Sequence, residues 1–252
     1  ILLQVVKFNT DRKATRVRVF EVGRGFLRDA SVPDSDTPVQ GLHQPMRVAG
    51  ISYGPLAPLQ WDQPERAADF YDLKADVQAL LMPAQASFEP SEHPAMHPGR
   101  CARVVLAGRV VGHVGELHPR WRQQWDLPQA PVLFELEWSA LTHQAVPVFQ
   151  GVARQQAVER DIALVVAEAV SHDQLMQAVH VAPTQGLLRQ AVLFDVYRPK
   201  QAAAGLQLGE KSLAVRLTLQ DDAATLTETQ IEAAVAAVVT QVERDLGARL
   251  RA

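Results

Sequence analysis

Histidines gather between residues 93 and 118 of the chain. His93 and His97 are four residues apart, and His113, Glu116 and His118 follow in one short segment. Imidazole and carboxylate groups are common metal ligands, and a spacing of four places two histidines on one face of a helix. The first chemistry that the sequence offers is therefore metal binding, as in a metal-dependent hydrolase that would use His93, His97 and His118.

Prolines beside these histidines argue against such a site. Pro94, Pro98 and Pro119 each follow a histidine directly, and a residue before proline favours an extended backbone over a helix. The sequence has neither an HExxH string nor a cysteine partner for the histidines. We therefore predict no metal site and interpret the segment as a structural loop.

Other reactive residues are equally isolated. Cys101 opens an apolar strand without a neighbouring base, which is typical of a small core residue rather than a nucleophile. Glu92, Glu116 and Asp126 could form an acid/base pair, but nothing in the sequence brings two of them together. The VGRGF string at 22–26 lacks the rest of any phosphate-binding glycine motif. We predict no catalytic residue in this chain.

Composition indicates a folded protein with a modest charge. The chain has 252 residues, of which 47% are hydrophobic and 21% charged, enough apolar material for one large core or two ordinary ones. It starts with Ile1 rather than methionine and shows no signal peptide, so we expect further sequence upstream. One cysteine and no apolar run of membrane-spanning length favour a cytoplasmic protein without membrane contact.

The net charge of −3 argues against a broadly basic surface that binds nucleic acid. Residues 151–252 contain ten Lys and Arg against twelve Asp and Glu. Any contact with RNA must therefore depend on a local group of residues.

The first part of the chain is predicted to form an antiparallel sheet with few helices. Alternating β-branched residues at 15–22 predict a strand that stops at Gly23 and Gly25. Further strands are expected at 47–53, from 101, from 109 and from 131, with a tight hairpin turn at Gly108 and Arg109 or their neighbours. The one helix, at 69–82, should place these residues on the sheet: Phe70, Leu73, Val77, Leu80 and Leu81.

A second domain is predicted after the aperiodic stretch 146–158, so the two domains are residues 1–150 and 151–252. Strands are expected from 161, from 187 and from 211, with a last short strand after Gly247. Ser171 can cap a helix through His180, and the pattern of Thr227 with Gln230 predicts a capped helix at 228–246. This β-α-β-β-α-β order is that of the ferredoxin-like fold, which hosts many functions.

Strings in both domains resemble one family, the beta subunit of bacterial phenylalanyl-tRNA synthetases. The second domain has LFDVY at 193–197, GEKSLAVRLTLQD at 209–221, and TLTETQIEAAVAAVV followed by LGARLR. The first has VFEVGRGF, FYDLKADVQALL, HPGRCARV and GHVGELHPRW in the family's order. Ala75 stands where the family usually has glycine, which is harmless in a helix.

The resemblance implies an α+β protein: a class II synthetase-like antiparallel sheet domain without an active site, followed by a ferredoxin-like domain that binds the anticodon of phenylalanine tRNA. In such a family the first domain packs against a catalytic alpha subunit within an alpha2-beta2 heterotetramer. The resemblance implies no cofactor in this chain, and ATP and magnesium for the whole enzyme.

Four positions match the family's anticodon-contacting residues: Asp195, Tyr197, Ser212 and Arg251. Tyrosine can stack on an unpaired base, and the other three can bond base edges or phosphate. Asp195 and Tyr197 should point to one face of their strand, and Ser212 can join them if its strand pairs alongside. Arg198, Lys200 and Lys211 are expected to add a local basic cluster.

Two other functions remain open at this point. One is the metal-dependent hydrolase described above, which requires bound metal. The other is a ferredoxin-like module for a small ligand, which predicts stabilisation by a metabolite and no response to RNA.

Overall fold

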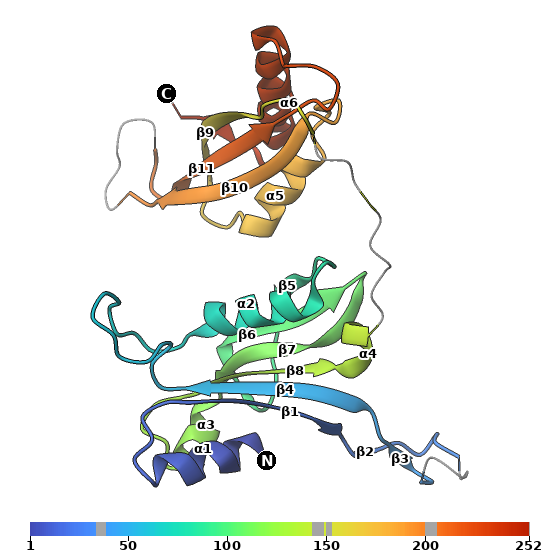
Figure 1. Cartoon of the computed structure of the whole chain (residues 1–252), viewed down its shortest axis with the longest axis vertical. Helices are drawn as coiled ribbons and strands as arrows, with labels where there is room; N and C mark the ends of the chain where they lie inside the picture. The colour runs from blue at the N-terminus through green and yellow to red at the C-terminus, as the bar shows by residue number, and fades with distance from the viewer. Residues whose placement is uncertain (34–38, 143–148, 150–152, 200–205, 252) are drawn as a thin grey trace. The chain divides into compact units, whose positions relative to one another are not determined.

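The computed structural model describes residues 1–33, 39–142, 149, 153–199 and 206–251, which Figure 1 shows as a cartoon. The chain divides into two compact units, Ile1–Pro147 and Val148–Ala252. The predicted boundary between residues 150 and 151 lies outside the described residues. None of the described helices is long and apolar enough to cross a membrane.

The first unit is built on a six-stranded sheet in which every neighbouring pair is antiparallel. Its strands, in spatial order, are β1 (Val17–Arg24), β4 (Met46–Tyr53), β8 (Val132–Glu137), β7 (Arg109–Leu117), β6 (Met96–Leu106) and β5 (Ser87–Pro90). Two short strands, β2 (Leu27–Arg28) and β3 (Leu42–His43), form a separate ladder. The predicted antiparallel architecture is confirmed.

Helix α2 (Phe70–Leu81) covers one face of this sheet. Its N-terminus is fixed by a capping box between Asp69 and Asp72, which satisfies backbone N–H groups that a first turn leaves unpaired. The predicted face is largely correct, because Leu73, Val77 and Leu81 are buried. Leu80 is exposed instead. The buried residues are each four positions apart, which places them on one face of the helix, and Leu80 lies off that face.

The opposite face is covered at one end by α1 (Leu2–Thr10) and α3 (Pro119–Gln124), as Figure 1 shows. A third helix, α4 (Trp138–Thr142), follows β8 and adds Ala140 to the core on the α2 side. None of the three has a counterpart among the predicted elements. The N-cap of α1 makes no side-chain bond, and α3 and α4 are too short to display a helical period.

The predicted end of one strand differs from the structure. β1 continues past Gly23 to Arg24, which pairs with Met46, and the N–H of Gly25 still donates to the carbonyl of Pro45. The hairpin between β6 and β7 turns at Ala107 and Gly108, both with positive φ, a conformation that fits the twist of a two-residue turn. The predicted tight turn at Gly108 and Arg109 or their neighbours is confirmed, and Arg109 begins β7.

The second unit has the predicted β-α-β-β-α-β order and a four-stranded antiparallel sheet. Its strands, in spatial order, are β10 (Leu188–Tyr197), β11 (Glu210–Leu219), β9 (Val158–Ala167) and β12 (Arg249–Leu250). The helices are α5 (His172–His180) and α6 (Glu228–Leu246). The predicted capping box of Thr227 with Gln230 is present, the predicted cap Ser171 also forms a capping box, with Gln174, and Gly247 ends α6 in the left-handed conformation.

Both helices of this unit pack on the same face of the sheet. The core on that face combines residues of β9 and β11 with residues of both helices: Ile162, Leu164, Val166, Leu213, Val215, Leu217, Leu175, Val179, Val238 and Val242. Because side chains alternate along a strand, the intervening residues lie on a face that neither helix covers. We call this the open face.

Replacing Leu164 by alanine tests this one-sided core. Leu164 is fully buried in the cluster beneath the helices, so Leu164→Ala should lower the free energy of unfolding of the second unit by about 2–5 kcal/mol. Leu250, its exposed partner on β12, supplies the control, and Leu250→Ala should cost far less. Urea unfolding followed by circular dichroism measures both, and equal losses would contradict the described core.

Candidate functional site

The open face of the four-stranded sheet brings together most of the predicted contact residues. Tyr197 lies opposite Ser212, and Asp195 lies opposite Ala214. Directly paired residues project to the same side of a sheet. Asp195, Tyr197 and Ser212 therefore share the open face, as strand alternation predicted, and Ser212 is buried there beside its neighbours.

A β-bulge produces this arrangement in β10. The register steps from Leu193 opposite Val215 to Asp195 opposite Ala214, which leaves Phe194 as an extra residue. Leu193 packs against the core, whereas Asp195 lies on the open face. Without the bulge, these two residues would project to the same side.

Phe194 and Arg216 belong to this face but were missed by the sequence analysis. Phe194 is 52% exposed, and the Arg216 guanidinium lies over its ring, 5.3 Å from the ring centroid. The only signal in the sequence is the adjacent pair of apolar residues before Asp195, which breaks the alternation of a half-buried strand.

Arg251 reaches the open face through β12. Its backbone N–H donates to the carbonyl of Ala163, which continues the ladder beyond Leu250. Its guanidinium lies over the Tyr197 ring, 5.1 Å from the centroid, within the range of a cation–π contact. Within the described ranges, no carboxylate forms an ion pair with Arg251.

The predicted basic cluster is only partly assembled. The Nε of Arg198 is 2.9 Å from Glu168 Oε1, and Lys211 Nζ donates to the carbonyl of the same glutamate at 2.8 Å. Lys211 is 8% exposed and lies opposite Val166, on the side that faces the helices. It is therefore not on the face of Ser212. Lys200 lies outside the described residues.

Ion pairs offset several other charges on and around the open face. Arg216 donates two hydrogen bonds of 2.8 Å to Asp161, and Glu159 is 3.4 Å away. The bond from Arg216 holds the pKa of Asp161 below its usual value. Arg249 likewise bonds Glu210 and lowers its pKa from 4.5 to about 2, with help from the N–H of Gln207. These carboxylates are ionised at neutral pH.

The histidine segment has a backbone role in the structure. His93, His97 and His118 each accept, on Nδ1, the N–H of the residue two positions later, at 3.0–3.2 Å. Each of them precedes a proline, but their settings differ: His93 precedes a turn, His97 lies in β6, and His118 is the N-cap of α3. Among the residues that the structure describes, no three His, Cys, Asp or Glu side chains are placed to hold a metal.

In the first sheet, His113 is half-buried and Cys101 is buried. The His113 ring lies 5.0 Å from the His93 ring. Burial lowers the pKa of His113, and the neighbouring His93 lowers it further. Burial raises the pKa of the Cys101 thiol, which contacts Met96 Sδ at 3.5 Å. A thiol with a raised pKa is a poor nucleophile, in agreement with the interpretation of Cys101 as a core residue.

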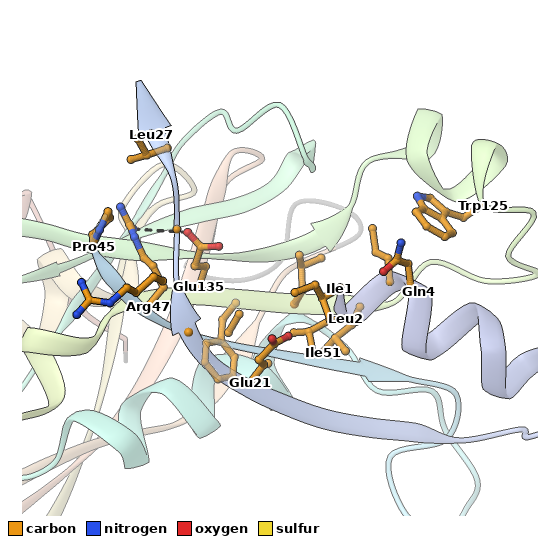
Figure 2. A pocket seen from close by; sticks show the side chains of 18 residues that line it. Ile1, Leu2, Gln4, Glu21, Leu27, Pro45, Arg47, Ile51, Trp125 and Glu135 are labelled. Carbon is orange, nitrogen blue, oxygen red and sulfur yellow. Dashed lines mark ion pairs between the residues drawn. The ribbon is translucent and has the colours of Figure 1, made fainter. Parts of the chain in front are cut away.

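The first unit has a cavity of about 500 Å³ on the side of its sheet that carries α1. Figure 2 shows Leu27, Pro45 and Arg47 at one end, and Gln4 and Trp125 at the other. The charged groups of Arg47 and Glu135 are 3.6 Å apart across the sheet and form an ion pair. A Cβ atom would fit at both Gly23 and Gly25, so neither glycine is required there by a close backbone contact.

Comparison with known proteins gives a match for each unit. The family model described as "Phenylalanyl tRNA synthetase beta chain CLM domain" matches residues 1–138. The model described as "Ferredoxin-fold anticodon binding domain" matches residues 153–251.

Curated relatives match over nearly the whole chain. The phenylalanine–tRNA ligase beta subunits of Ralstonia nicotianae, Cupriavidus pinatubonensis and Burkholderia lata are 52%, 48% and 45% identical to it, over 255, 254 and 254 residues. These alignments cover 99–100% of this chain but 31–32% of each relative. The chain thus spans about a third of the length of the curated relatives it matches.

The ion pair between Glu210 and Arg249 should affect the stability of the protein in acid. Because the pKa of Glu210 is lowered in the folded state, its contribution to stability is present above the unfolded value of 4.5 and is lost as the pH falls toward 2. In Glu210→Gln, stability should therefore fall less steeply than in wild type over this range.

Thermal melts at several pH values measure the effect. Glu232→Gln is the control, since Glu232 is exposed on α6 and forms no ion pair within the described part of the chain. A Glu210→Gln variant with the wild-type slope would show that the pair does not set the acid response.

Proposed function

Because the chain belongs to the phenylalanyl tRNA synthetase beta chain CLM domain family, we propose that its second unit binds the anticodon region of phenylalanine tRNA through the open face. The observation that carries the proposal is the Tyr197 ring, 42% exposed beneath Arg251 and beside Asp195 and Ser212. The match of residues 153–251 to an anticodon-binding family supports it.

Each residue has a role that follows from its chemistry. Tyr197 stacks on an unpaired base, which contributes roughly 1–3 kcal/mol. The Asp195 carboxylate accepts hydrogen bonds from a base edge, the Ser212 hydroxyl donates or accepts one, and the Arg251 guanidinium bonds a base edge or phosphate. Because these groups read base edges, they supply specificity rather than general attraction to RNA.

We assign the phosphate contacts to Arg198 and Lys200. The buried Lys211 acts through Glu168, which it shares with Arg198, and so helps to position that arginine. A small set of cations suits a unit whose acidic residues outnumber its basic ones.

For the whole protein, we propose a place in a phenylalanine–tRNA ligase that works in the cytoplasm. Catalysis with ATP and magnesium would reside in an alpha subunit, and the first unit would serve assembly of an alpha2-beta2 heterotetramer. The names of the relatives support the ligase assignment, and the separate matches to two non-overlapping family models support domain limits near 1–150 and 151–252.

An apolar groove of about 560 Å³ supports the assembly role of the first unit. It lies between β1, α2 and α4, and its lining includes the exposed side chains of Phe20, Val22, Leu80 and Trp138. Phe20 is 75% exposed. A contiguous apolar patch of this kind is typical of a surface that another protein covers.

Tyr197 provides the test of RNA binding. Tyr197→Ala should weaken binding of the phenylalanine tRNA anticodon stem-loop by about 1–3 kcal/mol, whereas Tyr197→Phe should cost much less because the ring remains. Lys200→Ala should instead weaken the binding of all stem-loops alike. It should also reduce the slope of log affinity against log salt by about 1, since one phosphate contact is lost. Fluorescence anisotropy at several salt concentrations measures these effects, and wild-type affinity of Tyr197→Ala would refute the anticodon assignment.

Association with the alpha subunit tests the groove. We expect partial complex formation at best, because an obligate interface normally buries more than about 2,000 Å² and this chain spans a third of its relatives' length. Phe20→Asp should abolish that association, since it places a charge on the apolar groove.

Size-exclusion chromatography of the mixture gives the measurement. Phe26→Asp is the matched control, because Phe26 is 68% exposed but does not line the groove. No shift in elution for wild type, or equal loss in both variants, would leave this groove without the proposed role.

A further inference from the structure

Phe194 is a half-exposed aromatic residue on the open face, which also carries Tyr197 and Val192. Neighbouring open-face residues on β11 are Ser212, Ala214 and Thr218. The bulge in β10 turns this residue away from the core, and about half of it stays exposed in the free protein. The ring is therefore available to a ligand with a flat apolar surface.

Arg216 fixes the Phe194 ring without offering a free charge. Its two bonds to Asp161 set the plane of the guanidinium, and Glu159 approaches it from the same strand. Two carboxylates beside one guanidinium leave no net positive charge for a phosphate. A ligand at this position must be recognised mainly by the face of the ring rather than by its charge.

The same combination occurs twice along β10. Phe194 lies under Arg216, and Tyr197 lies under Arg251. Residues 194 and 197 are three positions apart, at most about 10 Å along a regular strand. This exceeds the spacing of about 3.4 Å between stacked bases, so the two rings fit two bases that are separated from each other.

We propose that Phe194, oriented by Arg216, is a second base-stacking position, which binds one further unpaired nucleotide of the RNA segment that contacts Tyr197. This inference rests on the proposed function of the open face. It adds a subsite and predicts that the RNA is bound with at least two of its bases unstacked from each other. If Phe194 served only to cover the Arg216 side chain, replacing its ring would not change the affinity for RNA.

Affinity measurements with the whole 252-residue chain separate these cases. Phe194→Leu keeps the apolar volume and removes the aromatic face, so it should weaken binding of the phenylalanine tRNA anticodon stem-loop by about 5-fold or more. Its salt dependence should equal that of wild type, because no phosphate contact is lost. Phe194→Tyr should bind like wild type. Val192→Ala, on the same strand and face, controls for loss of exposed apolar surface and should have no effect.

A fluorescent base locates the nucleotide. Stem-loops that carry 2-aminopurine at one unpaired position at a time are titrated with wild type, Phe194→Leu and Tyr197→Ala. We expect the position whose fluorescence responds to Phe194→Leu to differ from the position that responds to Tyr197→Ala. Thermal melts of each variant verify that the fold is retained, which the exposure of Phe194 favours.

The outcomes distinguish the inference from the proposed function. Wild-type binding by Phe194→Leu, together with weakened binding by Tyr197→Ala, overturns the second position and leaves the anticodon assignment intact. A response of the same single nucleotide to both variants also overturns it. Wild-type binding by both variants contradicts the proposed function and the inference with it.

Discussion

Side-chain alternation in β10 is reversed at Phe194, and the open face depends on that reversal. A regular strand would place Leu193 and Asp195 on the same side, so either the leucine would leave the core or the carboxylate would enter it. Burial of an unpaired carboxylate costs far more than exposure of one leucine. The bulge at Phe194 removes the conflict, because Leu193 stays on the helix side while Asp195 and Tyr197 reach the open face.

The two sheets use their faces differently. In the second unit, α5 and α6 both pack on one face, which leaves the other free for contacts along β10, β11 and β12. In the first unit, helices lie on both faces, and the free apolar surface lies at the β1 edge beside α2 and α4. A flat face with separated aromatic rings suits nucleotides, whereas an apolar groove suits a protein partner.

Much of this fold could be predicted from the sequence because its signals are local. The capping boxes at Ser171 and Thr227 and the glycine after α6 mark helix ends by bonds within a few residues. Helix α1 was not predicted because its N-cap residue Ile1 makes no side-chain cap bond and Val6 is its only fully buried residue. Such a helix depends on tertiary packing, which a local pattern does not record.

The candidate site was predictable only where strand alternation is regular. Ser212 joins Tyr197 through simple pairing of β10 with β11. Phe194 was missed because a bulge depends on the register of two strands that are far apart in the sequence. Lys211 was expected to join a basic cluster with Arg198 and Lys200. Because side chains alternate along β11, however, Lys211 and the adjacent Ser212 lie on opposite faces of the sheet. Its burial against Glu168 follows from that step.

The paired arginines of the second unit have a consequence for competition among RNA molecules. Arg216 and Arg249 each have a carboxylate partner, so apart from the phosphate contacts assigned to Arg198 and Lys200 this surface exerts little attraction on the backbone of an arbitrary nucleic acid. A duplex hides its bases within the helix and would find few rings or free cations to hold it. On the proposed function, abundant structured RNA in a cell would therefore dissociate quickly from this face, and the face would stay available for a loop whose bases are already exposed.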